Sequence, residues 1–341
     1  GFENQPNYNE LKYAEKIAKR YNTNHFVKTV SPNDLLDFIP KITDIYDEPQ
    51  ADTTAIPIYF ISQLAKEENI KVVLNGDGPD ELFSGYTNYE RYVKTHQYFN
   101  FANKAPKFIK GIANNLVNKI QPGSPLSEMT NRLYNNQDFY WPGAGGMKES
   151  TKHNIISSHF KNSTNGHSSY NYVNQLKHDY NQFLDGHKFD YTNWLCYSGY
   201  RQAVTERFLY RADRLGMAHS IEARSPFLNH EMVQLALSIP SKYKIKNGVN
   251  KYILKKSLER ILPNEILYRK KMGFNLPIRE WAKETIYNGV KDNIVQFNKD
   301  TNIFNLEEVN TQLRLLKEGN DQYTNTIWSI YFLINWYKKW F

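Results

Sequence analysis

The feature that most constrains the fold of this chain is the run over residues 71–86, which reads KVVLNGDGPDELFSGY. The apolar triplet at 72–74 predicts a short buried strand. Gly76 and Gly78 then turn the chain, and Pro79 predicts the first turn of a helix. A strand that ends in a glycine-rich loop and leads into a helix is where α/β proteins place ligand-binding residues.

Three carboxylates, Asp77, Asp80 and Glu81, follow the strand and lie within a span of five residues. Carboxylates in such a loop suit a magnesium–triphosphate ligand, because Mg²⁺ is usually held by one or two carboxylates together with phosphate oxygens. An ordinary acidic helix cap after a turn would give the same local pattern. The loop alone therefore leaves both interpretations open.

Composition indicates a globular protein: 40% of the 341 residues are hydrophobic and 23% are charged. This length allows one large domain or two moderate ones. No run of about 18 or more apolar residues and no signal peptide is visible, so we expect no membrane partner and a cytoplasmic location. Because the numbering begins with Gly1, we expect a piece of a longer polypeptide.

The single cysteine and the positive net charge each limit which kinds of site and partner the chain can have. Cys196 excludes an internal disulfide and a cysteine-based zinc site, and we expect it to be a buried apolar residue. The net charge is +8, but the basic residues are dispersed except near Lys270. We therefore expect a solvated surface and a phosphate site, and no nucleic-acid partner.

Patterning divides the chain into residues 1–92 and 93–341. The first part alternates between helical and extended segments, as expected for a parallel sheet covered by helices. Its expected elements are a helix over 9–21, a strand over 24–30, a helix with Ser31 as its N-cap, and a helix over 55–67. The second part has mostly helical periodicity, interrupted by an irregular stretch over 121–165 that includes Trp141 to Gly146.

Two further segments mix charged and apolar residues. The segment 211–229, RADRLGMAHSIEARSPFLN, implies paired charges, because unpaired buried charges are costly. The segment 262–277, LPNEILYRKKMGFNLP, is a basic loop region. A structural ion-pair network would account for the first and a solvated loop for the second.

Taken together, these strings resemble the asparagine synthetases, a family of ATP-dependent amidotransferases. Residues 75–86 are similar to the family loop SGEGADELFGGY, and 211–229 to VDRMSMAHSLEVRVPFLD, with Asn229 where the family has Asp. Residues 262–277 and 47–57 resemble two more family segments. The resemblance implies an adenine nucleotide α-hydrolase-like parallel-sheet core, of the PP-loop ATP pyrophosphatase type, with a large, mostly helical C-terminal part.

The resemblance also implies a role for each matching position, and ATP and Mg²⁺ as cofactors. Asp77 stands where the family has a glutamate base and is one methylene shorter, and Lys271 falls on the lysine that contacts the ATP phosphates. The remaining implied residues are Asn75, Gly76 and Gly78 for the nucleotide, Asp52, Thr53 and Tyr86 for the substrate, and Asp80 and Glu81 for the metal. Lys251 is assigned nothing beyond packing or a salt bridge.

The implied function is ATP-dependent activation of a small carboxylate, with aspartate as the default, and its amidation by glutamine-derived ammonia. A sugar acid of surface-polysaccharide synthesis, an intramolecular amide as in β-lactam synthetases, and a non-catalytic binding module remain alternatives. The family's pyrophosphate loop, SGGXDS, and its N-terminal glutaminase domain are absent from this sequence. We therefore expect the fragment alone to be inactive. Its missing partner would be the glutaminase domain. The resemblance leaves open whether the chain forms a homodimer.

Overall fold

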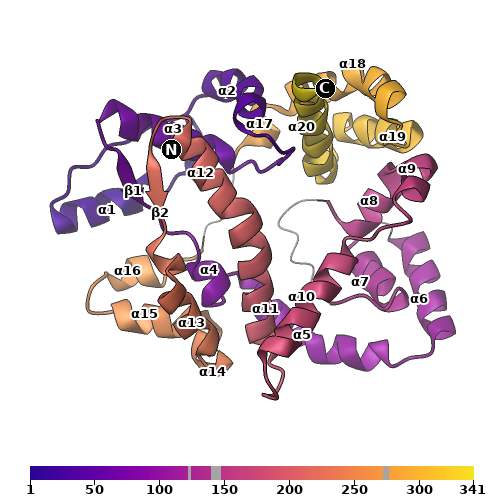
Figure 1. Cartoon of the computed structure of the whole chain (residues 1–341), viewed down its shortest axis with the longest axis horizontal. Coiled ribbons are helices and arrows are strands. Elements are labelled where there is room, and N and C mark those ends of the chain that lie inside the picture. Colours follow the sequence, from indigo (N-terminus) through magenta and orange to yellow (C-terminus); the bar gives the residue numbers. More distant parts are fainter. Residues whose placement is uncertain (122–123, 140–146, 272–275) are drawn as a thin grey trace.

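The computed structural model describes residues 1–121, 124–139, 147–271 and 276–341, and these are mostly helical (Figure 1). In chain order the elements are η1 (Pro6–Tyr8), α1 (Leu11–Tyr21), α2 (Pro32–Ile45), α3 (Ala55–Glu67), β1 (Val72–Leu74), α4 (Pro79–Leu82), α5 (Thr87–Asn103), α6 (Lys107–Ile120), α7 (Pro125–Tyr134), α8 (Glu149–Ile155), α9 (Ser158–Ser163), α10 (Tyr170–Phe183), α11 (Tyr191–Gly199), η2 (Tyr200–Phe208), α12 (Leu209–Met217), β2 (Glu222–Arg224), η3 (Pro226–Leu228), α13 (His230–Ser238), α14 (Ser241–Lys244), β3 (Ile245–Lys246), β4 (Val249–Asn250), α15 (Tyr252–Leu258), α16 (Asn264–Leu267), α17 (Ile278–Trp281), α18 (Lys283–Thr301), α19 (Leu306–Lys317), η4 (Asp321–Tyr323) and α20 (Thr324–Trp340). Within these ranges, no helix combines the length and apolar character needed to cross a bilayer.

The strands are few and short. β1 pairs in parallel with β2, with Val73 opposite Ala223, and β3 pairs antiparallel with β4. The strand expected over 24–30 is reduced to a parallel bridge between Phe2 and Val30. The prediction that β1 is buried is wrong: Val72 is 45% and Leu74 73% exposed, because no described residue covers the face that these two side chains share.

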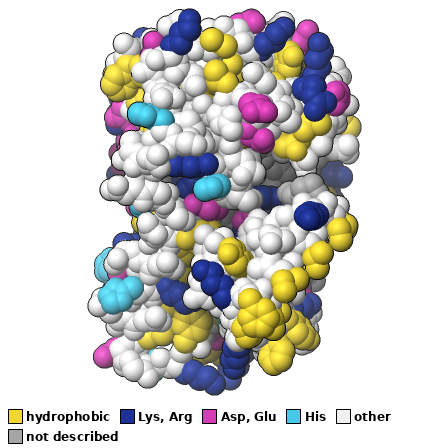
Figure 2. All heavy atoms as spheres, turned by 90° about the vertical axis from the view of Figure 1, so that its right-hand side faces the viewer, with side chains coloured by type: hydrophobic (Ala, Val, Ile, Leu, Met, Phe, Trp, Pro, Cys, Tyr) yellow, Lys and Arg dark blue, Asp and Glu magenta, His cyan; other side chains and the backbone are white. Residues whose placement is uncertain are grey.

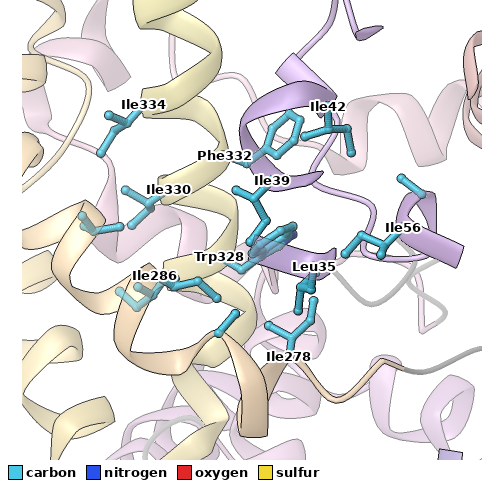
Figure 3. Close-up of a cluster of buried hydrophobic side chains, with 14 of the residues drawn as sticks. Leu35, Ile39, Ile42, Ile56, Ile278, Ile286, Trp328, Ile330, Phe332 and Ile334 are labelled. Carbon is cyan, nitrogen blue, oxygen red and sulfur yellow. The ribbon is translucent and has the colours of Figure 1, made fainter. Parts of the chain in front are cut away.

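The largest core lies where the first helices meet the last ones (Figure 3). Side chains of α2 and α3 pack there against those of α17, α18 and α20, so the two ends of the described chain share one core. The residues labelled in the figure are Leu35, Ile39, Ile42, Ile56, Ile278, Ile286, Trp328, Ile330, Phe332 and Ile334. The predicted cap of α2 is confirmed, because the Ser31 side chain and Asp34 form a reciprocal capping box.

The stretch 121–165 is more regular than predicted. It contains α7, α8 and α9, and two of these helices begin at serine caps. The Ser124 hydroxyl accepts the Ser127 N–H, and the Ser157 hydroxyl accepts the Phe160 N–H. Short, polar helices of this kind carry a weak periodic signal, which explains why the sequence suggested an irregular loop. Positions 141–146 of the predicted insertion lie outside the described residues.

One long helical segment crosses the molecule from α11 through η2 to α12 (Figure 1). Its middle part, η2, is a π-helix, in which each turn holds more residues than in an α-helix. The predicted burial of Cys196 in α11 is confirmed, since the side chain is fully buried. The residues that follow, in η2 and α12, face the candidate site.

Candidate active site

A cleft of about 1450 Å³ opens beside the loop that follows β1. Its walls come from the segment before α3, from the loop after β1, from the long helix with η2 and α12, and from α17 and α20. Among the residues that line it are 50–54, 75–77, Asp80, 86–88, 202, 203, 206–208, 211, 212, Lys271, 324, 325, 328 and 329. The volume exceeds that of most small-molecule pockets, so the cleft has room for a nucleotide together with a second substrate.

Asn75 organises the loop at the end of β1. Its backbone N–H donates to the carbonyl of Arg224 at 2.8 Å, which extends the pairing of β1 with β2. Its side-chain oxygen accepts the Ser225 hydroxyl at 2.5 Å and the Asp77 N–H at 3.3 Å. The sequence assigned Asn75 to nucleotide binding, and its side-chain oxygen already serves to shape the turn.

The two loop glycines have different surroundings. A Cβ at Gly76 would meet nothing within 4 Å, so this backbone is open to the cleft. Gly78 has a φ of +104°, and a Cβ there would lie 2.4 Å from Cδ2 of Leu228. Glycine at position 78 is therefore required by the turn and by packing against η3, and Gly78 does not line the cleft.

Asp80 is held between two lysines. One carboxylate oxygen lies 2.8 Å from the Nζ atom of Lys251, and the other lies 2.7 Å from that of Lys271. Burial favours the neutral acid, but the two ammonium groups hold the pKa of Asp80 below its ordinary value. Asp80 is therefore a carboxylate at the cleft wall whose charge is offset by two cations.

Glu81 points away from the cleft. Its side chain is buried and accepts a hydrogen bond from the hydroxyl of Tyr86. Burial raises the pKa of Glu81, and it also raises the pKa of Tyr86. Glu81 therefore fixes the position of Tyr86, whose side chain does line the cleft.

Arg211 of α12 joins two carboxylates from different segments. Its Nη1 atom donates to Asp52 at 3.0 Å, and its Nη2 atom lies 3.5 Å from an oxygen of Asp77. Asp52 also accepts the Thr54 hydroxyl at 2.7 Å, and Arg207 of η2 lies 3.8 Å from it. This network ties the segment before α3 to the loop after β1 through the long helix.

The two acids of this network have opposite pKa shifts. Burial works against the charge on Asp52, but Arg211 and Arg207 hold the pKa of its carboxyl below the ordinary value. Burial raises the pKa of Asp77. The nearby Arg211 offsets only part of this increase, and the charge on Asp52 raises the pKa further. An acid with a raised pKa can take up a proton nearer to neutral pH, which is the property of a general base.

Eight of the ten residues predicted from the sequence line one cleft. They are Asp52, Thr53, Asn75, Gly76, Asp77, Asp80, Tyr86 and Lys271, whereas Gly78 and Glu81 lie behind its wall. The sequence did not assign Arg207 or Arg211 to the site, although it predicted paired charges over 211–229. Asn229, which replaces a family aspartate, caps α13 by accepting the Glu231 N–H at 2.9 Å.

Magnesium fits this site only together with a nucleotide. The described ranges contain no group of three or more histidine, cysteine or acidic side chains that could hold a metal. Asp80 presents one carboxylate at the cleft, and both of its oxygens already contact lysine. An ion that brings phosphate oxygens with it needs only one or two protein carboxylates, and Asp80 suits that role.

The deciding comparison is with protein families. The model of the family described as "Asparagine synthase" matches residues 1–338. The chain belongs to the asparagine synthase family. The segments that carry the sequence resemblance and line the cleft are therefore parts of one family domain.

Individual relatives agree with this assignment. The chain is 30% identical over 341 residues to an asparagine synthetase (glutamine-hydrolyzing) of Bacillus subtilis. The aligned region covers 99% of this chain and 51% of the relative. A putative asparagine synthetase of Mycobacterium bovis is 28% identical over 83% of the chain and 41% of its own length. The chain thus spans about half of these relatives, or less. An asparagine synthetase of Gallus gallus is 47% identical over 68 residues, which are 19% of this chain and 12% of the relative.

Proposed function

We propose that this chain forms the synthetase part of an ATP-dependent amidotransferase, which adenylates a carboxylate and then amidates it with glutamine-derived ammonia. Aspartate is the first candidate acceptor. The observation that supports the proposal most is the convergence of Asp77, Asp80 and Lys271 on one cleft of a chain in the asparagine synthase family.

In the first step an oxygen of the substrate carboxylate attacks the α-phosphorus of ATP. The bond from that phosphorus to the bridging oxygen breaks, so an acyl-adenylate forms and pyrophosphate leaves. Lys271 offsets the charge that develops on the departing pyrophosphate. Mg²⁺, when bound with ATP, neutralises phosphate charge, and Asp80 is the residue that would hold it. Glu81, predicted as a second metal residue, enters this proposal as the acceptor that positions Tyr86.

In the second step ammonia attacks the activated carbonyl carbon, and AMP leaves with its electron pair. Asp77 accepts the proton that the attacking nitrogen must lose, for which its raised pKa is suited. Arg211 keeps Asp77 in place through its ion pair. Asp52 and Thr53 line the cleft beside this arginine, and we place the acceptor there. Asn75 and Gly76 contribute the loop backbone beside the nucleotide.

The fold completes this proposal. β1 and β2 are parallel, and the second edge of β1 is unpaired within the described residues. That edge offers its backbone N–H and C=O groups for pairing, which favours a further parallel strand from the parent polypeptide and hence a PP-loop sheet. That strand would bring the phosphate-binding loop, whose backbone N–H groups contact phosphates. A glutaminase domain in the same parent would supply the ammonia.

The test is release of AMP and pyrophosphate by the parent polypeptide with Mg-ATP, ammonia and a panel of carboxylates. Release that depends on aspartate, with a second, AMP-releasing step that Asp77→Asn weakens, supports asparagine synthesis. Release with uronic acids but not aspartate moves the proposal to sugar-acid amidation. No release with any acceptor, from a parent that lacks SGGXDS upstream of Gly1, indicates a non-catalytic module.

A further inference from the structure

α6 presents its apolar residues to solvent. Phe108 is 68% exposed, Ile112 58%, Leu116 55% and Ile120 75%, and Ile109 beside them is 47% exposed. In a helix, positions that recur every three to four residues lie on one face, so these five side chains form a single stripe. We call this stripe the α6 face.

The opposite side of α6 is polar or small and packs against α7. The Asn118 side chain donates to Asn131 at 3.2 Å and also accepts the Ser127 hydroxyl. A Cβ at Gly111 would lie 3.2 Å from the ring of Tyr134, so the two helices approach closely there. An amphipathic helix normally turns its apolar stripe to the core. α6 does the reverse, and no described residue covers the α6 face.

The preceding helix, α5, also exposes large apolar side chains, since Tyr98 is 77% and Phe101 79% exposed. Figure 2 looks onto the side of the molecule that carries α6 and shows apolar side chains gathered in its lower right part, beside Lys and Arg side chains. Contiguous exposed apolar surface of this kind marks an interaction site rather than ordinary solvent-facing surface.

Along the chain, the charge beside the α6 face is mostly basic, although Lys94 pairs with Glu90. Residues 91–127 contain no Asp or Glu and six basic residues, which are Arg91, Lys94, Lys104, Lys107, Lys110 and Lys119. The expectation that basic residues are dispersed outside the Lys270 region therefore overlooks this stretch. An apolar stripe flanked by lysines suits a surface that offers both hydrocarbon and negative charge.

We propose that the α6 face docks the protein peripherally on an anionic lipid surface. The apolar stripe would enter the boundary between headgroups and acyl chains, while the flanking lysines reach the phosphates. The expectation of no membrane partner was based on the absence of a spanning segment, which a helix lying in the interface does not need. This inference does not depend on the proposed function, because none of the α6-face residues lines the cleft.

Charge argues against a second copy of the chain as the occupant. A two-fold interface would set the same basic surface against itself, and like charges opposite each other oppose association. An anionic bilayer has the complementary sign over the whole face.

The experiment is co-sedimentation of the full chain with phosphatidylcholine vesicles, with and without about 30% phosphatidylglycerol. The test variant is the triple substitution Phe108→Ser, Ile112→Ser, Leu116→Ser. Its matched control is Phe183→Ser, Leu235→Ser, Val295→Ser, which removes equally exposed apolar side chains from α10, α13 and α18. Far-UV circular dichroism verifies that each variant is folded.

We expect the native chain and the control to bind anionic vesicles, and the test variant to bind at least about tenfold more weakly. Binding should weaken without phosphatidylglycerol and when NaCl rises from about 0.1 to about 0.5 M. A native chain that stays in the supernatant with both vesicle types overturns the proposal, as does a test variant that binds like the control. A dimer that the test variant alone dissociates, without vesicle binding, assigns the α6 face to a second copy instead.

Discussion

The Nζ atom of Lys271 lies 2.7 Å from a carboxylate oxygen of Asp80, although 191 positions separate the two residues. The pair joins the acidic loop after β1 to the basic segment that follows α16. Lys251 contacts the other oxygen of the same carboxylate. A ligand that takes Asp80 for itself would therefore free both ammonium groups from it, and that of Lys271, which lines the cleft, could then donate to phosphate oxygens.

Lys271→Ala in the parent polypeptide should reduce pyrophosphate release by about 100- to 1000-fold, as expected when a group that stabilises leaving-group charge is lost. The matched control is Lys270→Ala, which removes the same charge from the adjacent residue that does not line the cleft. Steady-state pyrophosphate release measures both. Equal rates for the native protein and Lys271→Ala would remove Lys271 from the reaction.

Lys251→Met should lower the free energy of unfolding by about 1–2 kcal/mol at neutral pH, because Asp80 loses one of its partners. The folded pKa of Asp80 is lowered, so its contribution to stability is present above the unfolded pKa and is lost as pH falls through the folded value. The difference between variant and native protein should therefore shrink in acid. Urea unfolding at several pH values measures it, and a difference that does not change with pH would contradict this account.

Asp77→Asn should suppress ammonia-dependent amide formation while leaving pyrophosphate release from the first step measurable. The base must be deprotonated to act, and burial raises its pKa. The native rate should therefore fall on the acidic side of the profile at a higher pH than for an ordinary aspartate. Rapid-quench assays that separate the two steps decide this. Equal loss of both steps would indicate that Asp77 acts before amide formation.

Arg211→Met should destabilise the fold by about 3 kcal/mol or more, because it leaves the buried Asp52 carboxylate without its main partner. Adding Asp52→Asn should recover part of that loss, since the amide carries no charge to bury. A double-mutant cycle in urea measures the coupling between the two residues. Strict additivity of the two substitutions would show that the pair does not interact in solution.

Glu81→Gln should keep the fold at neutral pH, since the amide oxygen can still accept the Tyr86 hydroxyl and no charge is buried. Glu81→Ala should lose about 2 kcal/mol, because it removes that acceptor and leaves a cavity. The raised pKa of Glu81 means that its charge costs stability as pH rises, and Glu81→Gln removes that cost. Thermal unfolding of the two variants tests this. A Glu81→Gln variant that folds but no longer responds to Mg²⁺ would make Glu81 a metal ligand after all.

The sequence predicted the local elements of the site well and the contacts between them poorly. α3 has the predicted bounds, and α4 begins at Pro79 as expected. These features follow from nearby residues, such as a proline at the first turn. Arg211, in contrast, reaches Asp52 across 159 positions. No local pattern encodes that contact, because it depends on how the long helix crosses the loop after β1.

A local pattern also does not encode side-chain direction. This explains why two of the predicted residues lie behind the wall of the cleft. Gly78 and Glu81 occur in the same short run as Asp77 and Asp80, and the sequence treated the run as one surface. The turn at Gly78 and the start of α4 point successive side chains in different directions. Asp80 therefore faces the cleft while Glu81 faces Tyr86 in the interior.

The π-helical segment η2 has a consequence for how this family can vary. Because each turn of η2 holds about one residue more than an α-helical turn, the face that α12 presents is rotated relative to α11. A single deletion within η2 would turn Arg211 by about 100° around the helix axis, away from both of its carboxylates. A relative without the π segment would need its arginine at a different distance from Gly199. The number of residues between Gly199 and Arg211 therefore determines whether the arginine points toward its two carboxylates.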